Sequence, residues 1–171
     1  LQKLIEIGIS LKEKLNSDQE DIVGVLLAIF HNLSTNKSAK GIIFSETCLW
    51  QWLEPMLKCD NEEYTIRTLF ILLNLSTAAE NKAKLADPQL GLCQTLVDIL
   101  RAQPNSSCRS KALLIINNIS MSDQLDFEFL SSESLGLLEQ LLSIAGSAEE
   151  SVADSIASLS ALRYLTVPRR S

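Results

Sequence analysis

A short tripeptide recurs along the chain, each time at the end of an apolar segment. Asn32-Leu33-Ser34, Asn74-Leu75-Ser76 and Asn118-Ile119-Ser120 are separated, from Asn to Asn, by 42 and 44 residues (74 − 32 and 118 − 74). A weaker copy, Tyr164-Leu165-Thr166, begins 46 residues after Asn118. A period of about 40 to 47 residues is typical of arrays of stacked helices. The spacing therefore predicts helical repeats, and no strand-like alternation competes with this interpretation.

Apolar residues outside the tripeptide follow the same period. A large apolar residue stands 11 positions after each Asn, at Ile43, Leu85 and Phe129. A leucine precedes the first three copies by 17, 17 and 18 residues and the fourth copy by 22 residues; these leucines are Leu15, Leu57, Leu100 and Leu142. The longer last interval predicts an insertion in the last repeat.

Each repeat is expected to hold a short, a medium and a long helix, predicted in the best-formed repeat over residues 78–86, 88–102 and 106–120. Pro88 fits the first turn of its helix, and Asp87 can cap that helix. The long helices are apolar over most of their circumference, which requires neighbours on at least two sides. The buried face of the medium helices is predicted to contain Trp50, Leu53, Met56 and Leu57, then Cys93, Leu96, Ile99 and Leu100, then Leu135, Leu138, Leu141 and Leu142.

The segment 72–81, read together with Gly91 nine residues before Leu100, resembles the armadillo consensus of β-catenin-like and importin-α-like proteins. The similarity covers nearly the whole chain. Gly91 has no counterpart at the aligned positions in the flanking repeats, Cys48 and Glu133, so the turn before the medium helix is expected to differ there. HEAT repeats are the near alternative, and the three-helix unit and the Asn-Leu-Ser signature favour armadillo repeats.

The resemblance implies an all-α fold, a right-handed α-solenoid of about three repeats with partial units at both ends. One repeat domain would occupy residues 1–171. It divides into a partial repeat (1–34), two repeats (35–76 and 77–120), a repeat with an insertion (121–166) and a tail (167–171). Because the first residue already lies in an apolar pattern, we expect the chain to be an excerpt of a longer protein.

In armadillo proteins the long helices line the concave side of the superhelix, and their late Asn residues contact the backbone of an extended peptide. The resemblance therefore implies that Asn32, Asn74 and Asn118 bind a peptide. An amide side chain suits this role because it both donates and accepts hydrogen bonds. The alternative is that each Asn satisfies backbone groups near its own helix end.

The importin-α-like pattern places a tryptophan four residues before each Asn, where this chain has Ala28, Phe70 and Leu114. These side chains attract an ammonium group less than tryptophan does, which disfavours a receptor for basic peptides. Arg67 and Lys111 stand seven residues before their Asn. Such a groove suits an apolar segment that carries acidic residues. The alternative is that Arg67 and Lys111 are ordinary solvated charges.

Two tryptophans lie on the first medium helix. Trp50 shares its face with Leu53 and Leu57 and is predicted to be core. Trp52 has two interpretations, namely packing against a neighbouring helix or an exposed contact point on the convex side.

Charge and composition exclude several partners. The net charge of −6 disfavours a nucleic-acid backbone as partner, and no apolar run approaches the roughly 18 to 20 residues of a membrane-spanning helix. The four cysteines have no metal or redox spacing, and a single histidine cannot complete a metal site with them. We expect reduced, mostly buried thiols and a cytoplasmic or nuclear protein without metal or cofactor.

The sequence predicts a protein–protein interaction module and not an enzyme. It has no glycine-rich phosphate loop, no nucleophile turn and only one histidine to act as a base. The expected ligand is a peptide or protein segment in the concave groove, and not a small molecule. An architectural segment of a larger assembly, with nothing in its groove, is the alternative, which unmasked apolar ends would favour.

Overall fold

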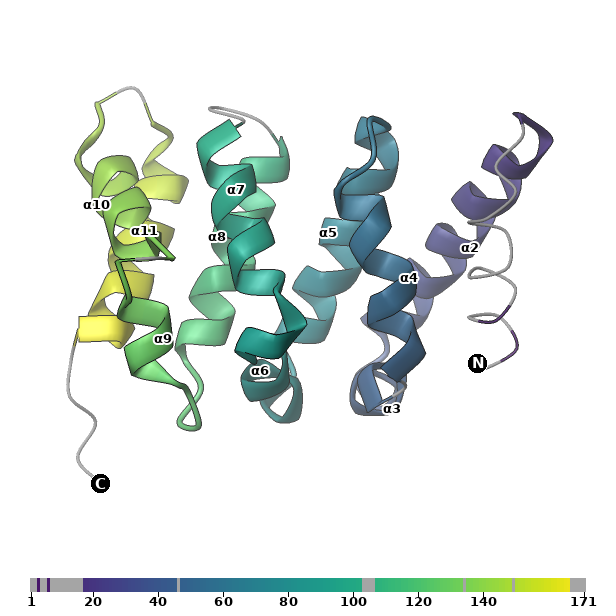
Figure 1. Cartoon of the computed structure of the whole chain (residues 1–171), viewed down its shortest axis with the longest axis horizontal. Coiled ribbons are helices and arrows are strands. Elements are labelled where there is room, and N and C mark those ends of the chain that lie inside the picture. The colour runs from purple at the N-terminus through teal and green to yellow at the C-terminus, as the bar shows by residue number, and fades with distance from the viewer. Residues whose placement is uncertain are drawn as a thin grey trace. The chain divides into compact units, whose positions relative to one another are not determined.

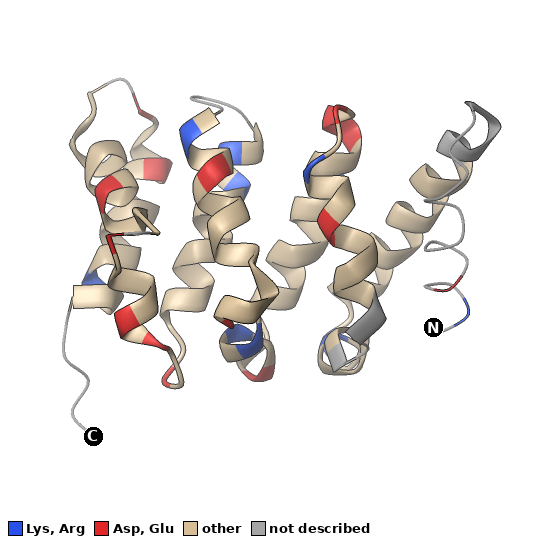
Figure 2. Cartoon of the chain, viewed as in Figure 1, with Lys and Arg blue, Asp and Glu red and all other residues tan. Residues whose placement is uncertain are grey.

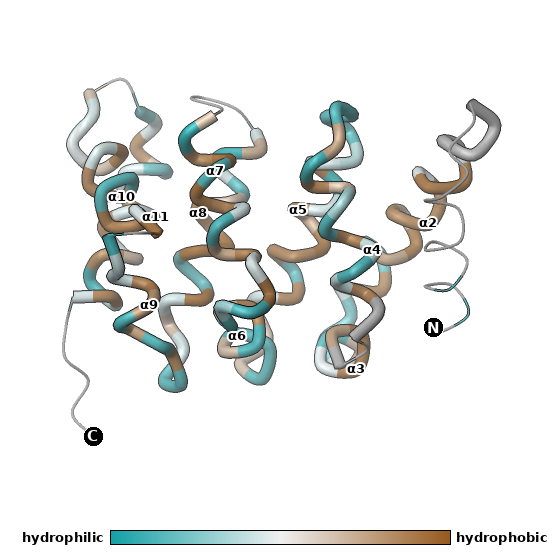
Figure 3. The backbone as a smooth tube through the Cα atoms, viewed as in Figure 1, coloured by the Kyte–Doolittle hydropathy of each residue, from teal (hydrophilic) through white to brown (hydrophobic). Residues whose placement is uncertain are grey.

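The computed structural model describes Lys3, Glu6 and residues 17–45, 47–102, 107–133, 135–148 and 150–166; the side chains of residues 17–21, 45, 47 and 48 are outside the described part. Every regular element in these ranges is a helix, which confirms the all-α prediction (Figure 1). The chain forms two compact units, residues 1–81 and 82–171. Hydrophilic residues gather at the turns between the helices (Figure 3).

The first unit contains four helices of the described range. They are α2 (Ser17–Thr35), α3 (Lys40–Ser45), α4 (Thr47–Leu57) and α5 (Glu62–Ser76). The long helix α5 packs against both α2 and α4, and α3 contacts all three. Asn61 begins α5 by accepting hydrogen bonds from the backbone N–H groups of Glu63 and Tyr64, and the acidic residues of the first turn favour the helix dipole.

The core of the first unit resolves the two interpretations of Trp52. Trp50 is buried as predicted, and Trp52 has no exposed surface. The Trp52 ring packs on Phe30 of α2, with 5.2 Å between ring centroids and 43° between the ring planes. Trp52 is therefore a packing residue and not a contact point on an outer surface. The predicted leucine Leu15 lies outside the described residues.

A buried amide side chain, that of Asn81, links two backbone segments at the end of the first unit. The short helix α6 (Ala79–Leu85) spans the point where the two units divide. Asn81 is fully buried, and its amide nitrogen donates to the carbonyl oxygens of Lys40 and Leu75, each at 3.1 Å. This residue ends the segment on which the armadillo resemblance depends, and its role here is to satisfy backbone groups.

The second unit contains a 3₁₀ turn, η1 (Pro88–Leu90), and then α7 (Leu92–Ala102), α8 (Ser107–Ser120), α9 (Phe127–Ser131), α10 (Leu137–Gly146) and α11 (Val152–Thr166). Asp87 caps η1 as expected. The predicted helix over 88–102 is divided at Gly91, whose φ of 71° is a left-handed conformation that glycine adopts without steric cost. α8 packs against α7 and α11, and α10 packs against α11.

The helix starts give a sharper period than the tripeptide does. The medium helices α4, α7 and α10 begin at residues 47, 92 and 137, which are 45 residues apart. The long helices α5, α8 and α11 begin at residues 62, 107 and 152, again 45 residues apart. With these bounds each long helix begins 15 residues after its medium helix, and the insertion expected in the last repeat stays a prediction.

The predicted buried face of the last medium helix is right for Leu135 and Leu141, which are buried, and wrong for Leu142. Leu137, Leu141 and Ile144 form the buried face of α10, whereas Leu142 is 62% exposed. The reason is the turn before the helix, where Gly136 has a φ of 67° and takes the position that Gly91 has before α7. The expectation that Gly91 has no counterpart in this repeat is therefore also wrong, because Gly136 was missed.

The residues 11 positions after each Asn are buried in two of three repeats. Ile43 and Leu85 are buried, but Phe129 is only half-buried and Leu130 is the buried residue beside it. Asp126 caps the short helix α9 by accepting a hydrogen bond from the N–H of Phe129. The buried position of this helix is therefore one residue later, at Leu130.

Within the described part of the chain Cys59, Cys93 and Cys108 take part in no disulfide, and Cys93 and Cys108 are buried. The Cys48 side chain lies outside the described part. Burial raises the pKa of the Cys93 thiol from 9.0 to about 12, because a thiolate would lose its hydration in the core. No described helix is long and apolar enough to cross a membrane.

We expect Cys93 to resist alkylation by iodoacetamide at pH 8 while the half-buried Cys59 reacts. Because the folded pKa is the higher one, the contribution of Cys93 to the free energy of unfolding is complete below pH 9.0 and falls as the pH rises from 9.0 to about 12. Peptide mass spectrometry of native and urea-unfolded protein measures both reactivities. Equal native rates for the two cysteines would contradict this prediction.

Candidate binding face on the long helices

Three predicted residues form one face of α5 in the first unit. Arg67, Phe70 and Asn74 follow each other at intervals of three and four residues, which places them along the same side of a helix. Phe70 is 37% exposed, and Arg67 and Asn74 are half-buried. This set is named the α5 face below. It presents a large apolar side chain between a cation and an amide.

The neighbouring helix α2 contributes a residue that sequence reasoning missed. The imidazole ring of His31 stacks on Phe70, with 5.5 Å between ring centroids and 23° between planes. The predicted residue Asn32 follows it on α2 and is exposed. His31 precedes the Asn of its repeat, but Leu73 and Asn117 hold this place in the next two repeats, so no periodic signal marks it.

Asn74 has a partner inside the protein. Its side-chain nitrogen Nδ2 donates to the hydroxyl of Ser34 on α2 at 3.0 Å. Ser34 is fully buried, and its own hydroxyl donates to the carbonyl oxygen of His31 at 2.7 Å. Asn74 therefore joins two successive long helices through the serine of the preceding tripeptide. This contact differs from the alternative in which the Asn satisfies backbone groups near its own helix end, because its partner is a side chain of another helix.

The serine of the tripeptide also has a local role in every described copy. Ser34, Ser76 and Ser120 are buried, and each hydroxyl donates to the carbonyl oxygen three residues earlier, at 2.7 to 2.8 Å. A buried hydroxyl must be hydrogen-bonded, and the last turn of a helix offers carbonyl groups without partners. The recurrence of serine thus has a structural cause that is independent of any ligand.

A double-mutant cycle measures the Asn74–Ser34 contact. We expect Asn74→Ala and Ser34→Ala each to lower the free energy of unfolding by about 1 kcal/mol, with a coupling energy of about 0.5–1.5 kcal/mol between them. Urea unfolding followed by tryptophan fluorescence reads this directly, since Trp50 and Trp52 are the two tryptophans of the chain and both lie in the first unit. Strictly additive effects would show that the hydrogen bond is not formed in solution.

Arg67 is engaged on its own helix. Its Nε and Nη2 atoms donate to one carboxylate oxygen of Glu63 at 3.0 and 2.7 Å. Both side chains are substantially exposed, 37% for Arg67 and 68% for Glu63. Exposed pairs of this kind contribute little to stability, so a ligand carboxylate can compete for the guanidinium group at low cost.

In the second unit, α8 carries the same spacing with Lys111, Leu114 and Asn118. Leu114 is 41% exposed, and Lys111 and Asn118 are half-buried. The Lys111 ammonium group donates to the backbone carbonyl of Ser107 at 3.2 Å and to its hydroxyl. The structure thus brings Arg67, Phe70 and Asn74 together on α5, and Lys111, Leu114 and Asn118 on α8.

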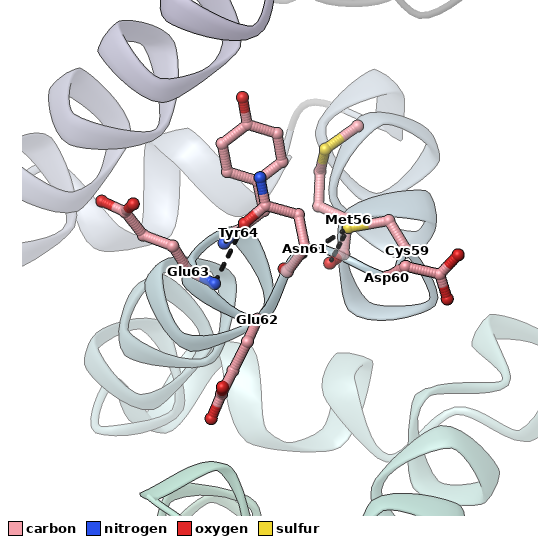
Figure 4. A pocket seen from close by; sticks show the side chains of 7 residues that line it. All are labelled: Met56, Cys59, Asp60, Asn61, Glu62, Glu63 and Tyr64. Atoms are coloured by element: carbon pink, nitrogen blue, oxygen red, sulfur yellow. Dashed lines mark hydrogen bonds between the residues drawn. The ribbon is translucent and has the colours of Figure 1, made fainter.

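A hollow of about 650 Å³ lies at the turn between α4 and α5 (Figure 4). Sequence reasoning did not single it out. Its lining residues are Met56, Cys59, Asp60, Asn61, Glu62, Glu63 and Tyr64. The Cys59 thiol donates to the carbonyl oxygen of Met56 at 3.3 Å, and Asn61 caps α5. Acidic residues gather at this end of α5, where they suit a helix N-terminus (Figure 2).

The described ranges hold no cluster of three or more His, Cys, Asp or Glu side chains that could bind a metal ion. No family model matches the chain, and no curated protein sequence matches it. The exposed faces of α5 and α8 are therefore the candidate binding surfaces of the described part.

Proposed function

We propose that this chain is an armadillo-like repeat module that binds a segment of another protein along the exposed faces of its long helices. The regular starts of α5, α8 and α11 support a repeat architecture, and stacking of such repeats would give the right-handed solenoid implied by the resemblance. The free thiols among the described cysteines agree with a reducing compartment such as the cytoplasm or nucleus.

One observation carries the proposal. Phe70 and Leu114 occupy the same place on α5 and α8, and both remain exposed although most large apolar residues of these helices are buried. Each is preceded three residues earlier by a cation and followed four residues later by an asparagine. An exposed apolar side chain repeated in one position of each long helix suits a partner segment that covers it, because covering it removes apolar surface from water.

The chemistry of the faces favours an apolar segment with acidic residues. Arg67 and Lys111 supply positive charge next to the apolar side chains in a protein whose net charge is −6. A basic peptide would meet these cations without a tryptophan to hold its ammonium groups. In this proposal Asn74 supports the face from within, through its bond to Ser34.

A peptide-display selection on the wild-type chain tests the proposal. The face variant carries Arg67→Glu, Phe70→Ala and Asn74→Ala, and the matched control carries Gln51→Ala on α4 and Lys58→Ala just after it, both at exposed positions. Circular dichroism first establishes that all three proteins are equally helical. We expect enriched acidic–apolar peptides whose dissociation constants rise at least about tenfold with the face variant and change little with the control. Enrichment of Lys/Arg-rich peptides alone, or equal losses in both variants, would contradict the proposal.

A second function, architectural stacking, is favoured by a different observation. Leu142 on α10 stands 45 residues after Val97 on α7, at the same place in its helix. Val97 is fully buried, whereas Leu142 is 62% exposed. An apolar residue that is exposed, at a position that is buried one repeat earlier, is expected where another helical repeat packs against it. A selection that returns no peptide, combined with an unoccupied α5 face in a native complex, would favour this function.

A further inference from the structure

A second exposed apolar side chain, Val25, stands near the α5 face and comes from the neighbouring helix α2. Val25 is 59% exposed. It stands seven residues before Asn32, as Arg67 stands seven residues before Asn74. The same 42-residue offset relates three buried residues of each helix, which are Leu27, Phe30 and Ser34 on α2 and Leu69, Leu72 and Ser76 on α5. Val25 therefore lies on the side of α2 that corresponds to the α5 face.

Helices α2 and α5 pack side by side, and two contacts fix their register (Figure 1). His31 stacks on Phe70, and the Ser34 hydroxyl accepts a hydrogen bond from Asn74. From the first contact to the second the chain advances by three residues on α2 and by four residues on α5. The two helices therefore run in the same direction here, and Phe70 lies level with His31.

This register places Val25 and Phe70 within reach of one short segment. Val25 precedes His31 by six residues, which is about 9 Å along the helix axis, and the axes of packed helices are about 8–10 Å apart. The two apolar side chains are therefore about 13 Å apart on the surface. Arg67 stands three residues before Phe70, at the level midway between the two apolar side chains. Ala28 lies at the same level on α2 and is small and half-buried, so a segment can pass over it close to Arg67.

The guanidinium group of Arg67 can bind a carboxylate without losing its own partner. Its Nε and Nη2 atoms donate to the same oxygen of Glu63, at 3.0 and 2.7 Å. A guanidinium group also has N–H donors on Nη1, and in the described part of the chain Nη1 of Arg67 donates to no protein group. The Arg67 side chain is 37% exposed, so these donors are open to a partner. A cation at the middle of the site favours a negative charge at the middle of the segment.

We infer that the first unit binds an extended segment of another protein in which two large apolar residues stand four positions apart, with an aspartate or glutamate midway between them. One apolar residue lies on Phe70, the other lies on Val25, and the carboxylate binds Arg67. The extended backbone follows from the distance, because it rises about 3.3 Å per residue and spans about 13 Å in four residues. Its side chains alternate, so the first, third and fifth residues all face the protein. The inference rests on the proposed function, because it names the sequence pattern of the partner of the same face.

Peptide display tests the pattern. Peptides are selected on the wild-type chain, and those whose binding is lost with Phe70→Ala are sequenced. We expect large apolar residues at the first and fifth positions of the enriched motif and Asp or Glu at the third, in either chain direction because the pattern is symmetric. Fluorescence anisotropy then compares one such peptide with versions in which the second apolar residue is moved by one position. These versions are expected to bind at least about fivefold more weakly, because an odd spacing turns that side chain away from the surface.

A double-mutant cycle assigns the second apolar residue of the peptide to Val25. We expect Val25→Ala to raise the dissociation constant at least about fivefold, because it removes methyl groups from the contact. Replacing the second apolar residue of the peptide by alanine is expected to have a similar effect on the wild-type chain and less than about a twofold effect on Val25→Ala. A second cycle joins Arg67→Ala with a peptide whose acidic residue is changed to its amide. Val152→Ala on α11 is the matched control, since Val152 is 76% exposed, and is expected to change affinity by less than about 1.5-fold.

The outcomes separate this inference from the proposed function. Peptides that depend on Phe70 but have another spacing, such as that of a helical segment, or that show no coupling to Val25, overturn the inference and leave the proposed function standing. If no peptide that depends on Phe70 is obtained, both are overturned. Self-association of the wild-type chain that Val25→Ala abolishes, measured by analytical ultracentrifugation, would identify a second copy as the occupant and also overturn the inference. Circular dichroism of each variant establishes that its fold is unchanged.

Discussion

Glu150→Ala lowers the free energy of unfolding of the second unit by about 3–5 kcal/mol, as does Arg109→Ala. Arg109 on α8 and Glu150, just before α11, approach to 2.7 Å, and their side chains are only 8% and 9% exposed. Removing either side chain breaks this buried ion pair while the other charge stays buried, and the lost attraction is the largest contribution to the decrease in stability. The neighbouring bond from the Ser110 hydroxyl to Asp154, at 3.1 Å, cannot replace that counterion.

Replacing both charges tests whether the loss comes from an unpaired charge. We expect Arg109→Met combined with Glu150→Leu to lie within about 1 kcal/mol of wild type, or above it, because the pair loses hydration on burial. Glu63→Ala, which breaks the exposed Arg67–Glu63 pair, is the matched control, with an expected loss of at most about 1 kcal/mol. Hydrogen exchange of α8 and α11 localises the effect. A double variant as unstable as the single variants would contradict the explanation.

Trp52→Ala lowers the free energy of unfolding of the first unit by about 3–5 kcal/mol. Trp52 has no exposed surface, and it fills the space between α4 and α2 against Phe30. Truncation to alanine removes most of the ring's apolar contacts and leaves a cavity, because α2 and α4 are also held by α3 and α5 and cannot close together. The loss is read by urea unfolding followed by circular dichroism and by the fluorescence of the remaining Trp50.

Trp52→Phe separates packing from hydrogen bonding at the same site. In the described part of the chain the indole N–H of Trp52 has no hydrogen-bond partner. Phenylalanine keeps most of the ring volume and removes this buried donor, so we expect a loss of no more than about 1.5 kcal/mol. Gln51→Ala, next to it but exposed, is expected to change stability by less than about 0.5 kcal/mol. A phenylalanine variant as unstable as the alanine variant would show that the N–H is satisfied in solution.

Local sequence patterns were sufficient for the helices and for most of the core. The apolar periodicity predicted the medium and long helices to within a few residues, whereas Asp87 and Pro88 mark the start of the 3₁₀ turn η1 and not that of the medium helix α7. An apolar helix face and a helix cap are both formed by residues that are close in sequence. Such features can therefore be predicted from local sequence patterns. Phe70 and Leu114 were indicated by the resemblance to the importin-α-like pattern, and both side chains are exposed.

The register of the last repeat needed the backbone conformation. Leucine occupies Leu135, Leu137, Leu138, Leu141 and Leu142, so several registers place leucine on a buried face. The choice among them was made by Gly136, whose left-handed conformation sets where α10 begins. Leu142 follows the buried Leu141 by one residue, a rotation of about 100° around the helix, so it lies off the buried face.

The sequence by itself determined an all-helical chain with a repeating pattern, the positions of the long-helix faces and the residue types on them. Only the tertiary structure decided which residues meet across about 40 positions of sequence: Asn74 with Ser34, Phe70 with His31, and Arg109 with Glu150. The apolar periodicity of a sequence predicts which positions of one helix are buried, because burial is a property of each position separately. A contact between two side chains on different helices depends on how each helix is rotated about its axis and shifted along it. The packing between the two helices sets both.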